Sequence, residues 1–167
     1  MAHPFRPGQS ATVYAVPGSL LKRPELAALI GSICSDWAYL ESSLRMFYAH
    51  LMGVYLEPTP GYELPSHPVA DQIFDEIQTI HSRIQLVRRL AKWVITDEKQ
   101  RKEVLDVLDK LKKAGKGRNK VAHAVWGICD SEPDALILLG TFGQKLVYKK
   151  RDFERILEQI WRKWGRS

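Results

Sequence analysis

Apolar residues recur at steps of three and four along most of this chain, which is the spacing of one face of an α-helix. The longest such series runs from Pro24 until Gly53 and comprises Leu26, Ile30, Ile33, Trp37, Leu40, Leu44, Phe47 and Leu51. Pro24 suits a first helical turn, because its missing N–H has no helical partner there. The pattern therefore predicts one long amphipathic helix from Pro24 to about Gly53.

A second series continues the same spacing from Val69 to Val94 and predicts one continuous helix. The intervening residues 54–67 contain three prolines and a glycine, which favour a connecting loop. Thr96 or Asp97 is a suitable cap for a third helix, and Gly115 with Gly117 is expected to end it. A short fourth helix is then expected to begin near Arg118.

The periodicity changes after Gly127. Two β-rich runs, residues 134–139 and 145–148, predict a small hairpin. Asp152 is suited to cap a last helix whose apolar positions run from Phe153 to Trp164. Residues 1–23 are rich in proline and glycine and predict an extended N-terminal arm. Residues 24–167 are expected to form one domain, an all-α up-down bundle of four to five helices with a hairpin insertion before the last helix.

Composition excludes several classes of protein. With 167 residues, of which 45% are hydrophobic, the chain can build a full core without disulfides or a structural metal. Its two cysteines, Cys34 and Cys129, are far apart and are expected to be buried free thiols. No apolar run approaches the length of a membrane span, and the N-terminus does not resemble a secretory signal, so we expect a cytoplasmic protein. No phosphate-binding loop, dinucleotide fingerprint or dimetal motif occurs, and no cofactor or metal is expected.

Positive charge is concentrated in one segment. Residues 110–120 read KLKKAGKGRNK, with six basic residues and no acid, which equals the whole net charge of +6. Such a run is either an ordinary solvated helix face or a surface that follows the phosphates of RNA, and the lysines expected to do so are Lys112, Lys113, Lys116 and Lys120.

The same segment leads into a guanidinium, a carboxamide and an imidazole within six residues, at Arg118, Asn119 and His123. On a helix that starts near Arg118, Asn119 and His123 lie on one face, where the amide can orient the imidazole. Arg118 and His123 would point about 140° apart. The preceding glycines would let a phosphate approach the free N–H groups of the helix start. Val121 and Val125 are expected to be in the core.

These groups suit cleavage of RNA. An imidazole that titrates near neutral pH can take a proton from a 2′-hydroxyl or donate one to the leaving 5′-oxygen, and arginine can stabilise the charge that develops on the phosphate. The reaction needs no metal, but it needs both a base and an acid, and one motif supplies a single histidine. We therefore expect a homodimer in which two motifs face one cleft.

The segment Arg118-Asn119-Lys120-Val121-Ala122-His123 resembles the R-[polar]-x3-H motif of the HEPN superfamily, the higher eukaryotes and prokaryotes nucleotide-binding domains. The following Ala124-Val125-Trp126-Gly127 and the Trp37-x3-Glu41 of the first predicted helix are also similar to bacterial HEPN-like proteins. As an order of helices the resemblance covers residues 24–165, although the specific match is much shorter.

The resemblance implies a helical bundle that acts as a dimeric, metal-independent endoribonuclease, often a toxin or an anti-phage effector. Arg118 would bind the scissile phosphate, Asn119 would orient the imidazole, and His123 would be the acid–base group. Activity could be masked by an antitoxin or another regulatory protein. Some relatives keep the bundle without nuclease activity, so a non-catalytic interaction or nucleotide-binding module is the alternative.

Two further residues have open interpretations. Glu41 either helps to position Arg118 or is an exposed or ion-paired glutamate. Trp126, like Trp37, either stacks on a base near the site or belongs to the core.

Overall fold

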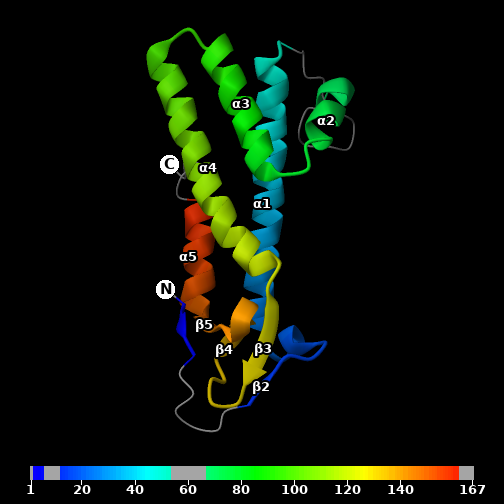
Figure 1. The fold of residues 1–167 in the computed structure, drawn as a ribbon, viewed down its shortest axis with the longest axis vertical. Coiled ribbons are helices and arrows are strands. Elements are labelled where there is room, and N and C mark those ends of the chain that lie inside the picture. Colours follow the sequence, from blue (N-terminus) through cyan, green and yellow to red (C-terminus); the bar gives the residue numbers. More distant parts are fainter. Residues whose placement is uncertain (1, 6–11, 54–66, 162–167) are drawn as a thin grey trace. The chain divides into compact units, whose positions relative to one another are not determined.

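The computed structural model describes residues 2–5, 12–53 and 67–161. These residues form five α-helices and a five-stranded antiparallel sheet, with two short 3-10 helices, η1 (Ser19–Lys22) and η2 (Thr141–Gly143) (Figure 1). The chain divides into two compact units. Residues 37–115 form the helical unit, and residues 1–36 with 116–167 form the sheet unit. In the part of the chain described, no helix combines the length and the apolar character that crossing a bilayer requires.

The helical unit contains the second half of α1 (Pro24–Leu51), all of α2 (Pro68–Asp75) and α3 (Ile80–Val94), and most of α4 (Glu98–Ala122). The predicted first helix is confirmed almost residue for residue. Its apolar face is buried, as shown by Trp37, Leu40 and Leu44. At the start of α4, the carboxylate of Asp97 accepts a hydrogen bond from the N–H of Gln100 at 2.7 Å, so Asp97 is the cap.

The prediction of one helix from Val69 to Val94 is wrong, because the chain leaves the helix between α2 and α3. Thr79 caps α3 by accepting a hydrogen bond from the N–H of Ser82, and Arg83 Nε donates to the carbonyl of Ile77 at 2.8 Å. These side chains satisfy backbone groups that a continuous helix would pair internally. In α2 the buried residues are Ala70 and Phe74, whereas Val69 and Ile73 of the predicted stripe are exposed.

The predicted helix end at Gly115 and Gly117 is also wrong, since α4 continues through both glycines to Ala122. Close packing explains the first glycine. A Cβ on Gly115 would lie 2.9 Å from Cη2 of Trp37, whose side chain is 1% exposed. Gly115 is therefore required by the approach of a buried ring and not by a chain reversal.

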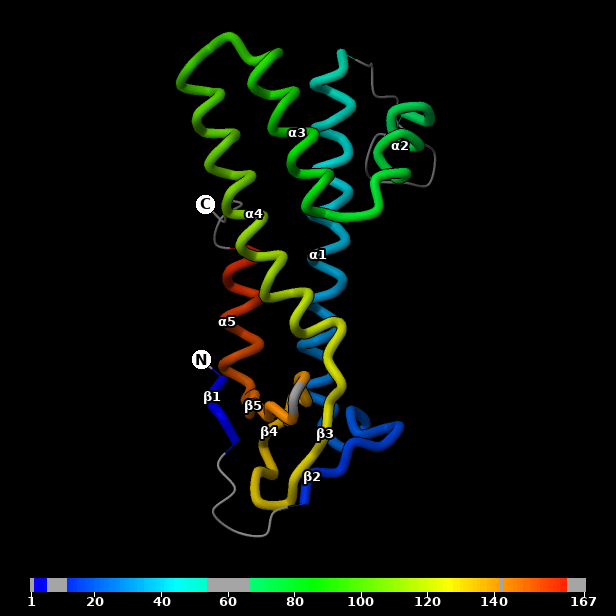
Figure 2. The backbone as a smooth tube through the Cα atoms, in the orientation of Figure 1, coloured from blue at the N-terminus to red at the C-terminus, as the bar shows by residue number. Residues whose placement is uncertain are grey.

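The sheet unit contains five strands in the order β1-β5-β4-β3-β2. The predicted hairpin is confirmed as β4 (Ala135–Leu139) and β5 (Lys145–Lys149), and β3 (Val125–Cys129) pairs with β4. The N-terminal arm supplies both edges: β1 (His3–Pro4) pairs with β5, and β2 (Val13–Tyr14) pairs with β3 (Figure 2). The described residues are therefore mostly helical with a β insertion, as predicted, but the five-stranded sheet means that the fold is not purely all-α.

The sheet buries side chains on both faces. On one face, Trp126 meets Tyr148 edge to face, with ring centroids 5.3 Å apart, and both rings pack on Phe153 of α5 (Lys150–Trp161). On the other face, Phe5 and Val13 of the arm pack on a buried cluster of Cys129, Ala135, Ile137 and Val147. Of the two free thiols, Cys129 is buried as expected and Cys34 is partly buried.

The start of α5 differs slightly from the predicted cap. Asp152 lies within the first turn of α5 and is not the residue before it. Its carboxylate accepts a hydrogen bond from the N–H of Lys149 and so stabilises the start of the helix. Almost all of the loop expected over residues 54–67, and Trp164 of the last helix, lie outside the described residues.

Candidate catalytic and nucleic-acid site

The Arg118–His123 motif lies at the C-terminal end of a helix and not at a helix start. Arg118 and Asn119 belong to the last turns of α4, and the N–H of His123, directly after the helix, donates to the carbonyl of Asn119 at 3.2 Å. The expected phosphate site on free N–H groups is therefore wrong. This end of a helix presents carbonyl oxygens and favours cations, so any bound phosphate must be held by side chains.

The turn after α4 is anchored in the core of the sheet unit. Trp126 Nε1 donates a hydrogen bond to the carbonyl of Val121 at 3.3 Å, and both side chains are buried, at 8% and 1% exposure. One carbonyl of the helix end is thereby satisfied, and β3 starts in a fixed place beside His123. The expectation that Val125 is in the core is wrong, since this residue starts β3 and is 59% exposed.

Polar side chains of the motif are accessible. His123 and Asn119 are exposed, as are Lys116 and Lys120, and Arg118 is partly buried. On an ideal helix these four exposed residues lie within an arc of about 100°, so they share one face. Lys112 and Lys113 are also exposed, on the part of α4 that belongs to the helical unit.

Within the motif, the amide of Asn119 is bonded to arginine. Arg118 Nη1 donates to Asn119 Oδ1 at 3.1 Å, which brings the guanidinium round the helix toward the exposed face. Arg118 Nε is buried and has no hydrogen-bond partner among the described residues. The described contacts contain no hydrogen bond between the side chains of Asn119 and His123, so the structure joins Arg118 to Asn119 and leaves the imidazole exposed.

The two supporting residues named from the sequence have structural partners. Glu41 belongs to the helical unit, where its carboxylate pairs with Arg83 Nη1 at 3.9 Å. Trp126 is in the core of the sheet unit, where it packs on Tyr148. Burial raises the pKa of Tyr148 above its ordinary value of 10.0, and the nearby carboxylate of Asp152 adds to this effect.

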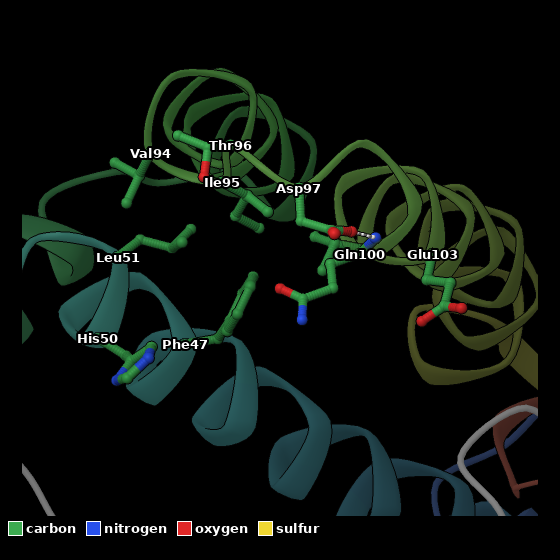
Figure 3. Close-up of a pocket in the computed structure, with 10 residues that line it drawn as sticks. Phe47, His50, Leu51, Val94, Ile95, Thr96, Asp97, Gln100 and Glu103 are labelled. Atoms are coloured by element: carbon green, nitrogen blue, oxygen red, sulfur yellow. Dashed lines mark hydrogen bonds between the residues drawn. The ribbon is translucent and has the colours of Figure 1, made fainter.

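The helical unit has a hollow of about 490 Å³ that the sequence did not indicate. It lies between the end of α1 and the junction of α3 with α4, where Phe47 points from α1 toward Ile95 and Gln100 (Figure 3). Two acids, Asp97 and Glu103, line it, and Asp97 is already engaged as the cap of α4. Over the described residues, no group of three or more His, Cys, Asp and Glu side chains is arranged to bind a metal.

One exposed aromatic residue was not singled out from the sequence. Trp93 on α3 is 89% exposed, and it lies beside the exposed cations Arg89 and Lys92. The available signal was the composition of α3, which has four basic residues and no acid between Ile80 and Val94.

Comparisons of this chain with protein-family models, with curated proteins and with solved structures find no match.

Proposed function

We propose that this chain is a metal-independent endoribonuclease of the HEPN type, with His123 as its acid–base group. The observation that carries the proposal is the exposed imidazole of His123, one turn beyond an Asn119 amide that is hydrogen-bonded to Arg118, on a helix face with Lys116 and Lys120. No carboxylate interrupts this basic segment from Lys110 to Lys120. Solvent exposure is what a polynucleotide substrate requires of such a group.

The chemistry follows from the side chains. His123 exchanges a proton with the 2′-hydroxyl or with the leaving 5′-oxygen, and the cleavage yields a 2′,3′-cyclic phosphate and a 5′-hydroxyl. Arg118, held by Asn119, presents the remaining N–H groups of its two Nη atoms to the phosphate oxygens as their charge increases. Lys116 and Lys120 supply the electrostatic attraction to the RNA backbone that the helix C-terminus itself does not provide.

One motif contributes one histidine, so the proposal includes a homodimer that brings two copies of His123 to one scissile phosphate. The HEPN resemblance supports the same assembly, an up-down bundle as the minimal fold, and a biological role as a toxin or phage-defence effector in the cytoplasm. An antitoxin or other regulatory protein that masks the basic face is the partner this role requires.

Purified protein mixed with RNA in excess EDTA tests the proposal. We expect cleavage to persist in EDTA, to leave 2′,3′-cyclic phosphate ends and to fall by at least about 100-fold in His123→Ala, in line with the contribution of a general acid–base group. His81→Ala is the matched control, because His81 is also exposed but lies on α3. Equal cleavage by His123→Ala and the parent would rule out the mechanism.

A second candidate function is a non-catalytic module that binds RNA, a nucleotide or a partner protein. The hydrogen bond from Arg118 to Asn119 favours it, since the amide is joined to the guanidinium and no described hydrogen bond orients the imidazole ring of His123. Its signature is binding without turnover, unaffected by His123→Ala and weakened by Lys116→Ala with Lys120→Ala.

A further inference from the structure

Among the described tryptophans, Trp93 is the one whose side chain is largely exposed to solvent. Trp37 and Trp126 are buried, and Trp161 donates a hydrogen bond to Asp36, whereas Trp93 is 89% exposed. An indole is among the largest apolar side chains, and its exposure contributes nothing to folding. An exposed aromatic side chain beside cations is the combination that sites for single-stranded nucleic acid use.

Two residues close to Trp93 on α3 are cations that form no ion pair with a described carboxylate. Of the four basic residues on α3, Arg83 pairs with Glu41 and Asp75, and Arg88 pairs with Asp109. Arg89 and Lys92 are exposed, and no described carboxylate forms an ion pair with either. Arg89 lies four residues before Trp93 and three before Lys92, so the three side chains are neighbours on one helix surface.

We propose that this group, Arg89, Lys92 and Trp93, is a binding site for single-stranded nucleic acid. The indole stacks on an unpaired base, and the guanidinium and ammonium groups bind the phosphates on either side of it. A duplex offers no free base face to the indole, which selects the single strand. A protein partner would need its own acidic groups to match two cations around one ring, whereas a polynucleotide carries base and phosphate in each repeat.

The site is separate from the proposed catalytic motif. It belongs to the helical unit and uses none of the residues from Arg118 to His123, which belong to the sheet unit. It therefore stands whether or not His123 cleaves RNA. If both proposals hold, it gives the enzyme a second contact with unpaired RNA.

Binding of short labelled oligonucleotides, measured by fluorescence anisotropy in EDTA, tests the site. The protein carries His123→Ala so that cleavage does not consume the RNA, and RNA and DNA strands of the same sequence are compared with their duplexes. We expect Trp93→Ala to weaken single-strand binding by about 5- to 100-fold, the range of base–aromatic stacking, and Trp93→Phe to retain most of the affinity. Tyr39→Ala, which removes an aromatic side chain that is 50% exposed on α1, is the matched control and should change nothing.

The two cations have their own readout. Arg89→Ala with Lys92→Ala should lower the slope of log Kd against log salt concentration by about 0.7 for each phosphate that is no longer neutralised. A preference for RNA over DNA would mean that a 2′-hydroxyl is also bound, and equal binding would mean that stacking and charge suffice. An unchanged affinity in Trp93→Ala, equal losses in Trp93→Ala and Trp93→Phe, or duplex binding as tight as single-strand binding would overturn the proposal.

Discussion

Replacing Gly115 with alanine places two well-measured effects in opposition. Alanine in a helix interior is favoured over glycine by about 1 kcal/mol, so a glycine-to-alanine change within α4 should stabilise the protein if space is available. At Gly115 the new Cβ would lie 2.9 Å from Cη2 and 3.3 Å from Cζ2 of Trp37. The ring is rigid and 1% exposed, so it has little room to move away.

Overpacking of this kind costs about 1–3 kcal/mol, which equals or exceeds the gain in helix propensity. We therefore expect Gly115→Ala to lower the free energy of unfolding by about 0–2 kcal/mol. Gly117→Ala is the matched control two residues along the same helix. Its Cβ would meet Ile156 Cγ2 at 3.7 Å, an ordinary contact, so the propensity gain should be retained.

Urea unfolding followed by circular dichroism measures both variants, and the difference between them should be about 1–3 kcal/mol. Trp37→Phe provides the second arm, since it removes the ring atoms that crowd the new methyl group. It should cost less in the Gly115→Ala background than in the parent, as a favourable coupling between the two positions. If Gly115→Ala stabilises the protein as much as Gly117→Ala does, the packing explanation for this glycine is wrong.

Three further predictions concern residues that stabilise the fold. Arg83→Ala should destabilise the helical unit by about 2–3 kcal/mol, because it removes charge-assisted hydrogen bonds and ion pairs between α1, α2 and α3. Arg89→Ala is the control and should change stability by less than about 0.5 kcal/mol in the same urea titration. Asp97→Ala should cost about 1 kcal/mol through loss of the cap of α4, and an unchanged melting temperature would contradict this role. For Tyr148, whose folded pKa is raised above 10.0 by burial and by Asp152, the folded state keeps the phenol proton to higher pH than the unfolded chain. The stability that the protonated phenol contributes is therefore complete below about pH 10 and is lost as pH rises through the folded pKa. Tyr148→Phe should lose less stability than the parent between about pH 9 and 11.5, and equal losses would contradict the assignment.

The position of the motif changes how an RNA substrate must be held. At a helix start, backbone N–H groups would have bound phosphate without help from side chains. At the C-terminal end of α4 the free backbone groups are carbonyls, so binding depends on lysine and arginine side chains and should weaken steeply with salt. The exposed stripe with Lys116 and Lys120 beside His123 is consistent with this requirement.

The sequence correctly predicted those helices and strands that depend on residues close together in the chain. The apolar spacing and Pro24 were sufficient for α1, the β-rich runs for the β4–β5 hairpin, and the cap candidates Thr96 and Asp97 for the start of α4. Each depends on the preferences of neighbouring residues along one stretch of chain, which a sequence displays directly. The candidate residues of the motif, Arg118, Asn119 and His123, were likewise visible as residue types at a short spacing.

Contacts between residues that are distant in the sequence decided the other features of the fold. From the sequence, Gly115 is typical of a helix end, but it is a glycine because Trp37, far away in the sequence, occupies the space where a side chain would be. The apolar spacing through residues 69–94 is the same for one helix or two, and Arg83 and Thr79 make the break favourable by satisfying the backbone groups at the junction. The edges of the sheet are completed by the arm through backbone hydrogen bonds, which carry no side-chain pattern. Sequence therefore determined which residues prefer helix, strand or cap, and the tertiary structure alone determined where helices continue, what the arm pairs with, and that His123 stands exposed at the end of α4.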